Sequence, residues 1–210
     1  MNKYLNFSPF YFFCLYSALF IILTAVSNYL LYDDALYYES LGDRLDIARI
    51  DEIIKQQKFF QKIGYGIVPI QLLLRIFYTS VCLIIGALLS EQNLNFSQCF
   101  NIAIKADIIF LLELFVKIDY FAIAGINSLE EMNIRLFSVL QLAGAKETWM
   151  LYPLSLLNIF ELVYWILLAI FLSNYTKKSF GYSIGFVAKT YGLGLLLWVM
   201  FVMFLILNIA

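Results

Sequence analysis

Four charged residues lie in segments that are otherwise apolar enough to cross a lipid bilayer. Two are bases and two are acids, and they come from three separate segments: Arg75, Glu113, Lys117 and Glu161. A helix rises about 1.5 Å per residue, which places all four within about two turns of the bilayer midplane. An unpaired charge at that depth costs about 2.5–3.5 kcal/mol on insertion scales. The sequence therefore predicts a neutral cluster in which Arg75 meets Glu113 or Glu161 and Lys117 takes the other carboxylate.

Such a cluster has two interpretations. Ionisable groups inside a membrane commonly form a proton path, an ion path or an anion site, here built on Arg75. The alternative is an ion-paired staple that fixes how the helices pack. The four charges sum to zero and the chain contains no histidine, the residue that most often carries protons near neutral pH. These two facts favour the staple, and the flanking acids Asp107 and Asp119 are predicted to lie at the membrane interfaces.

The elements that must position these charges follow from composition. Of the 210 residues, 63% are hydrophobic and 14% are charged, whereas a soluble domain has about 45–50% apolar and about 25% charged residues. The prediction is an all-α, polytopic transmembrane helical bundle that forms one domain over 1–210 and has the lipid bilayer as its surroundings. Five segments are long enough to span it, at 9–31, 63–89, 106–124, 149–172 and 191–208.

The most charged part of the chain predicts an additional, amphipathic helix at about 43–62. Asp43 is placed to cap its N-terminus, acids come first and bases follow, which suits the helix dipole. Its apolar stripe consists of Ile47, Ile50, Ile53, Ile54 and Phe60. This helix is expected to lie on the membrane surface or against a partner protein, and docking on its own bundle fits the pattern equally well.

Five spans would put the two ends of the chain on opposite sides of the membrane. The side that holds the amphipathic helix has seven Lys and Arg residues (44, 49, 55, 58, 62, 135 and 146) and the other has five (3, 105, 177, 178 and 189). The positive-inside rule then favours an N-terminus outside and a C-terminus in the cytoplasm. The abundance of Ile, Lys, Asn, Phe and Tyr is typical of an AT-rich genome and indicates a multi-pass protein of a bacterial inner membrane.

Several functional classes are not expected. The 14 Lys and Arg residues against 15 Asp and Glu residues give no basic field that would attract nucleic acid. The chain contains no HExxH, P-loop or GxSxG motif. Its cysteines, Cys14, Cys82 and Cys99, form no CxxC pair. We therefore expect no enzymatic activity, no cofactor and no metal, with an enzyme that uses interfacial carboxylates as a remote alternative.

Two local motifs resemble known membrane proteins. The run from Tyr152 to Glu161, together with Ile63-Gly64-Tyr65 and Tyr191-Gly192-Leu193-Gly194, resembles the bacterial Yip1-like integral membrane proteins. This resemblance covers about 58–210 and implies five spans without catalytic residues. The loop Leu142-Ala143-Gly144-Ala145-Lys146, followed by Trp149, is similar to the cytoplasmic coupling loop of ABC importer permeases, which implies a cytoplasmic third loop.

The resulting functional prediction is a non-enzymatic membrane subunit or assembly factor of a larger complex in secretion, envelope or transport machinery. The near absence of mass outside the membrane, the missing catalytic motifs and the amphipathic helix support it. Its expected partners are lipid and other membrane subunits. The alternative is a permease subunit or small transporter that uses the charge cluster at the midplane.

Overall fold

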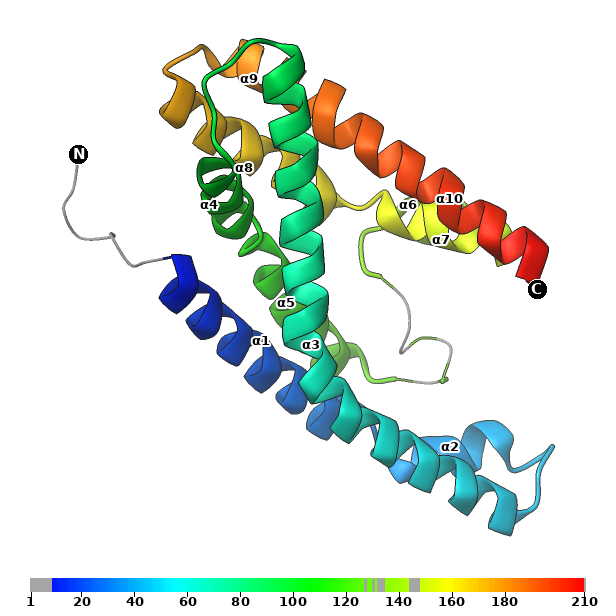
Figure 1. Cartoon of the computed structure of the whole chain (residues 1–210). Helices are drawn as coiled ribbons and strands as arrows, with labels where there is room; N and C mark the ends of the chain where they lie inside the picture. Colours follow the sequence, from blue (N-terminus) through cyan, green and yellow to red (C-terminus); the bar gives the residue numbers. More distant parts are fainter. Residues whose placement is uncertain (1–8, 127, 130, 132–134, 144–147, 210) are drawn as a thin grey trace. The chain divides into compact units, whose positions relative to one another are not determined.

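The computed structural model is a helical protein, described over residues 9–209 except 127, 130, 132–134 and 144–147. No β-strand occurs in these described residues. The elements in chain order are α1 (Pro9–Leu31), α2 (Asp34–Leu41), α3 (Ile47–Leu89), α4 (Phe96–Ala106), α5 (Ile109–Ala124), α6 (Val139–Ala143), α7 (Thr148–Leu156), α8 (Ile159–Thr176), α9 (Phe180–Val187), the π-helical turn η3 (Ala188–Gly192) and α10 (Leu193–Ile209) (Figure 1). The predicted all-α class is confirmed.

Four helical stretches in the described residues are long and apolar enough to cross a membrane. They are α1, α3, α8 and the stretch Phe180–Asn208, in which α9, η3 and α10 follow one another without a break. Each has an 18-residue window of high hydropathy with at most two charged residues. The chain is therefore a multi-pass α-helical membrane protein.

The third predicted span, 106–124, is interrupted near its start. Helix α4 begins early, at Phe96, because Asn95 and Gln98 cap it reciprocally: each side chain accepts from the backbone N–H of the other residue, at 2.9 and 3.0 Å. The helix then ends with Asp107 as its C-cap, and α5 begins at Ile109 with only 16 residues. The count of five spans is thus not confirmed. If the four long stretches cross the membrane, both ends of the chain lie on the same side. The prediction of opposite sides depended on five spans, and that count is not confirmed.

The other predicted bounds also change. The segment 149–172 divides into α7 and α8 at Asn158, whose extended backbone and side-chain bond to the Glu161 N–H (2.8 Å) start a new helix. The last span begins at Phe180 instead of Tyr191. Ser179 caps a helix there, ahead of the predicted start of the span. The amphipathic segment begins at Ile47 and not at Asp43. It continues without interruption into the predicted span 63–89, so that α3 has 43 residues.

The described helices divide into two compact units. The first consists of Met1–Leu73 and Phe110–Ile134, and the second of Leu74–Ile109 and Arg135–Ala210. In the second unit, α8 packs against α4 and α9, and α7 packs against α10. Its most deeply buried apolar side chains come from α3, α4, α8 and α9: Ile76, Leu83, Cys99, Ile102, Leu168, Leu172 and Val187. Such close packing positions the polar side chains described below.

The contact between α3 and η3 depends on a glycine. A Cβ built on Gly86 would overlap Cγ2 of Thr190, so alanine there forces the two backbones apart. We expect Gly86→Ala to destabilise the protein by about 1–3 kcal/mol, the usual cost of inserting a methyl group into a packed site. This cost exceeds the gain of about 1 kcal/mol that alanine makes over glycine in a helix.

Thermal unfolding in detergent tests this expectation, with Gly64→Ala as the matched control. Gly64 lies in the same helix, and a Cβ there meets no atom within 4 Å. The control variant should unfold at or slightly above the temperature of the wild type. Equal melting temperatures for Gly86→Ala and Gly64→Ala would contradict the close approach of α3 and η3.

Candidate functional site

The second unit contains a buried ion pair between α3 and the end of α4. Nη2 of Arg75 lies 2.6 Å from Oδ2 of Asp107, whose side chain is fully buried. The side chain of Arg75 is 31% exposed, so the guanidinium reaches inward from a partly covered position. Asp107, which the sequence predicts to lie at a membrane interface, is buried among the helices, and its depth in the membrane stays a prediction. The interruption after α4 turns this carboxylate into the protein, where Arg75 neutralises it.

A second buried carboxylate, Glu161, occupies the first turn of α8 and is 7% exposed. Its Oε1 atom accepts hydrogen bonds from the hydroxyl of Tyr191 at 2.9 Å and from Nε1 of Trp165 at 3.0 Å. The alternative in which Arg75 forms its ion pair with Glu161 is therefore wrong. Arg75 is in electrostatic range of Glu161 but not in salt-bridge contact with it. The geometry favours Asp107 because it ends α4 directly opposite the guanidinium.

A hydrogen bond between two hydroxyl groups joins α8 to α3 within the same unit. Tyr164 of α8, which is fully buried, donates to Oγ1 of Thr79 of α3 at 3.0 Å. Its ring contacts the ring of Tyr191 edge to face, with centroids 5.4 Å apart. Tyr164 is also in electrostatic range of both Arg75 and Asp107. We call this group the polar cluster; its members are Arg75, Thr79, Asp107, Glu161, Tyr164, Trp165 and Tyr191.

The π-helical turn η3 brings Tyr191 to the polar cluster. One additional residue in a turn rotates the following helix by about 100° relative to a regular α-helix. Gly192 lets this turn lie on the indole of Trp165, since a Cβ there would come within 2.7 Å of the ring. Beyond it, the carbonyl oxygen of Gly194 accepts from the hydroxyl of Tyr78 at 2.6 Å. The turn is thus held from α3 and α8 together, and π-turns of this kind are frequent at functional sites.

The polar cluster offers a limited chemistry. One guanidinium, two carboxylates and three hydroxyl groups can hold a proton, orient a small ion or fix the helices in register. No group of three His, Cys, Asp or Glu side chains in the described part of the chain could hold a metal ion. The cysteines Cys82 and Cys99 are separate, free thiols.

The remaining predicted cluster residues, Glu113 and Lys117, lie one turn apart on α5 and are both half-buried. They belong to the first unit. Their positions relative to Arg75 and Glu161 are not determined, so the predicted meeting of all four charges stays a prediction.

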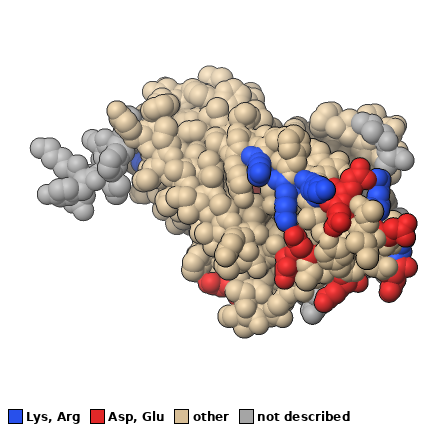
Figure 2. Space-filling model, turned by 90° about the horizontal axis from the view of Figure 1, so that it is seen from below, with Lys and Arg blue, Asp and Glu red and all other residues tan. Residues whose placement is uncertain are grey.

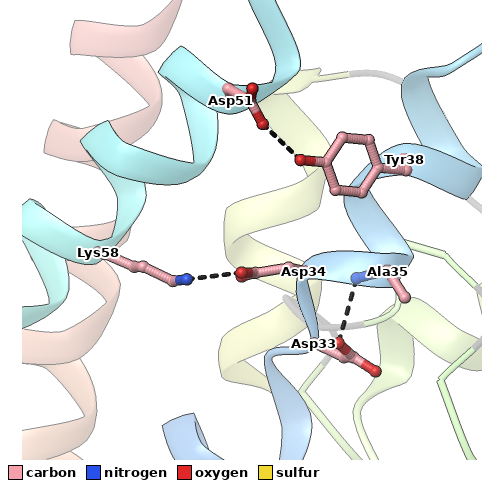
Figure 3. A network of polar contacts seen from close by, with 6 residues as sticks. All are labelled: Asp33, Asp34, Ala35, Tyr38, Asp51 and Lys58. Carbon is pink, nitrogen blue, oxygen red and sulfur yellow. Dashed lines mark hydrogen bonds and ion pairs between the residues drawn. The ribbon is translucent and has the colours of Figure 1, made fainter. Parts of the chain in front are cut away.

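A second group of polar contacts joins α2 to the first part of α3 within the first unit (Figure 3). Oδ2 of Asp34 lies 2.6 Å from Nζ of Lys58, and the hydroxyl of Tyr38 donates to Asp51. Asp33 caps α2, its side chain accepting from the N–H of Ala35 at 3.1 Å. These contacts form a helical hairpin, which we call the α2–α3 hairpin.

The apolar stripe predicted for docking is divided by this hairpin. Ile50 and Ile54 are buried against Tyr37 of α2, and Ile53 packs at the edge of the same cluster. Only Ile47 and Phe60 remain exposed, at 71% and 55%. The sequence left open whether the stripe lies on the membrane surface, on a partner protein or on the protein's own helices. The centre of the stripe docks on the protein's own helices. Ile50 and Ile54 therefore offer no surface to a partner.

Charged side chains gather in one region of the face seen from below in Figure 2, with blue and red atoms intermixed and most of the face tan. The α2–α3 hairpin carries both signs, as in the pair of Arg49 and Glu52. Such exposed pairs contribute little stability because water screens them.

The contact between Tyr38 and Asp51 predicts a pH dependence. The hydrogen bond to the carboxylate, and the burial and charges around it, raise the pKa of the Tyr38 phenol above its ordinary value. The contact is therefore complete at neutral pH and is lost as the pH rises through the raised pKa. We expect Tyr38→Phe to accelerate amide exchange in α2 at neutral pH, where the wild type is protected. Hydrogen exchange measured by mass spectrometry tests this, and unchanged exchange in α2 would contradict it; Tyr29→Phe, at an 87% exposed position, is the control.

The signals for several cluster members are weak in the sequence. Tyr191, at the start of the predicted last span, resembles the aromatic residues of interface belts, and the π-turn brings it inward. The capping pattern of Asn95 and Gln98 marks the start of α4 at Phe96, ahead of the predicted span 106–124, and does not itself locate the C-cap Asp107.

The chain was also compared with known proteins. It matches no protein-family model, no curated protein and no solved structure. The resemblances to Yip1-like proteins and to the permease loop therefore stay predictions.

Proposed function

We propose that this chain is a non-enzymatic subunit or assembly factor of a larger membrane complex, with a bacterial inner membrane as its location. The proposal rests on the low burial of two long helical stretches within the protein, α1 and Phe180–Asn208. The most apolar window of α1 is 17% buried and that of Phe180–Asn208 is 6% buried, against 39% for α3. Helices associate in membranes through close packing, and most side chains in these two windows are not buried in the protein, which leaves surface for contacts with lipid or with other subunits.

The polar contacts support the same proposal. Asp107 is neutralised by Arg75, and Glu161 accepts two hydrogen bonds that join α8 to η3. Such contacts stabilise one arrangement of the helices. A second unit that is held by these contacts and carries the little-covered stretch Phe180–Asn208 is suited to assembly within secretion, envelope or transport machinery.

Purification of the tagged protein at native expression levels tests the proposal. We expect native mass spectrometry from a mild detergent to give a mass well above the 24.3 kDa of one chain, with other membrane proteins bound. Combined truncation of Leu197 and Phe204, which lie seven residues apart on α10 and are 65% and 61% exposed, should reduce the bound partners. Truncation of Leu74, 63% exposed on α3, is the control. Recovery of only monomers or homo-oligomers would refute the proposal.

A second candidate function is transport, as a permease subunit or small carrier. It is favoured by the position of the polar cluster beside two breaks between helices, Asp107–Ile108 and Leu157–Asn158, and beside the π-helical turn η3. Membrane transporters build their binding sites at such interruptions. Proton flux into proteoliposomes, followed with an enclosed pH-sensitive dye under an imposed potential, tests this candidate. Flux that persists after Arg75→Gln and Glu161→Gln are combined would exclude a mechanism through the cluster.

A further inference from the structure

The two buried carboxylates of the polar cluster have different partners. Asp107 faces the guanidinium of Arg75 at 2.6 Å. Glu161 is 7% exposed, and in the described part of the chain no cation lies within ion-pair distance of it. Its two hydrogen-bond donors, the Tyr191 hydroxyl and the Trp165 indole, are both neutral. The guanidinium of Arg75 is therefore near two buried carboxylates. It forms an ion pair with Asp107 and not with Glu161.

The charge of Glu161 is balanced between opposing influences. Burial in an apolar helix disfavours the ionised form. The N-terminal turn of α8, the two donors and the more distant charges of Arg75 and Arg135 favour it. Tyr164, which has Asp107 as a neighbour of its own, and Tyr191 are further titratable groups near Glu161. Since no ion pair to a described residue involves Glu161, protonation of this side chain breaks no salt bridge among them.

The two oxygen atoms of Glu161 have different roles. Both hydrogen bonds reach Oε1, and Oε2 accepts none from the described residues. A proton can therefore add at Oε2 without displacing either donor. We propose that Glu161 is a reversible proton-binding site: a proton from water adds to Oε2, the carboxylate becomes a neutral carboxylic acid, and the proton is returned to water on deprotonation.

Trp165 lies where its surroundings depend on the protonation of Glu161. Trp165 donates to the carboxylate and lies 6.0 Å from the ring of Tyr191, centroid to centroid, and it supports η3 at Gly192. When Oε1 loses its charge, both hydrogen bonds weaken, since bonds to ionised acceptors are the stronger ones. The surroundings of the Trp165 indole therefore change with the protonation of Glu161, as do the contacts that hold η3. This property is independent of the functions proposed above.

The experiment uses the full chain in lipid nanodiscs with a single tryptophan. The protein has three tryptophans, so Trp149→Phe and Trp198→Phe leave only Trp165. A titration from about pH 4 to about pH 10 covers the range in which buried carboxyl groups lose their protons. We expect the fluorescence of Trp165 and the infrared C=O band of a protonated carboxylic acid to change with the same midpoint.

Glu161→Gln is the decisive variant, because its amide oxygen can still accept from Tyr191 and Trp165 but cannot titrate. Both signals should be lost in it and kept in Glu113→Gln. Tyr191→Phe, a second variant that removes one donor, should move the midpoint. Persistence of both titrations in Glu161→Gln, or their absence in the parent protein, would overturn the proposal. A midpoint that changes when sodium chloride replaces choline chloride would assign the site to a metal cation and overturn it as well.

Discussion

Reversal of the charge at Arg75 alone, in the variant Arg75→Asp, is expected to prevent accumulation of the protein in the membrane. Combination with Asp107→Arg is expected to restore a substantial part of it. The single variant places two carboxylates against each other where the wild type has an ion pair of 2.6 Å. Loss of one partner of a buried pair costs about 3–5 kcal/mol. This cost is a large part of the free energy of unfolding of a typical protein, which is about 5–15 kcal/mol.

Quantification of the protein in the membrane fraction, with tagged variants expressed from the same promoter, measures this effect. The matched control is Lys178→Asp, which reverses a charge in the exposed turn between α8 and α9. The control should accumulate normally, because charges outside the packed helices are hydrated and screened. Normal accumulation of Arg75→Leu would show that the pair is dispensable, and failure of the double reversal to improve on Arg75→Asp would show that the two side chains do not act as a pair.

The sequence was sufficient to identify two charged members of the polar cluster, Arg75 and Glu161, but not the partners of either one. Depth along a helix follows from residue number, and Arg75 and Glu161 were identified on this ground. The pairing depends on which helices end where. Asp107 was assigned to the interface on the assumption that 106–124 forms one straight helix, and the end of α4 at Ala106 removes that assumption.

The helical class could be predicted with confidence from composition, whereas the bounds of the helices could not. Hydropathy is averaged over about 19 residues, so it does not register a single capping residue. Asn158 lies inside an apolar stretch and nevertheless starts a helix, because its side chain accepts from the Glu161 N–H at 2.8 Å. The pattern of an Asn followed three residues later by Gln or Glu occurs at Asn95 and at Asn158, and it identifies where α4 and α8 begin when capping is considered beside hydropathy.

The amphipathic helix shows a different limit. Periodicity identifies which residues share a face, but not what covers that face. The short segment Asp34–Leu41 carries no strong periodic signal, yet it forms α2 and supplies Tyr37 against Ile50 and Ile54. Two consecutive acids before it, Asp33 and Asp34, resemble solvated loop residues, and in the structure one caps α2 and the other pairs with Lys58.

Truncation of Tyr164 to alanine is expected to be the most damaging neutral substitution in the second unit. The side chain is fully buried, donates to Thr79 at 3.0 Å and contacts the ring of Tyr191, so that it joins α8 to α3 and to η3. In soluble cores, truncation of a large aromatic residue costs about 3–5 kcal/mol, part of it for transfer to water and part for the cavity. Within a membrane the transfer part is absent, because lipid is as apolar as the protein interior, and the loss of packing remains. We therefore expect a loss of about 2 kcal/mol or more.

Two further variants separate packing from hydrogen bonding. Tyr164→Phe removes only the hydroxyl and should cost about 0.6 kcal/mol, the average for a hydrogen bond between membrane helices. Tyr175→Ala, at a 41% exposed position on the same helix, makes the same truncation without opening a cavity and should change stability little. Unfolding of the purified variants in mixed micelles with increasing denaturing detergent measures all three. If Tyr164→Phe costs as much as Tyr164→Ala, the hydroxyl and not the ring holds α8 in place. If Tyr175→Ala is equally damaging, burial of Tyr164 does not explain the loss of stability. Tyr175 is exposed and lacks the contacts that Tyr164 makes with Thr79 and Tyr191.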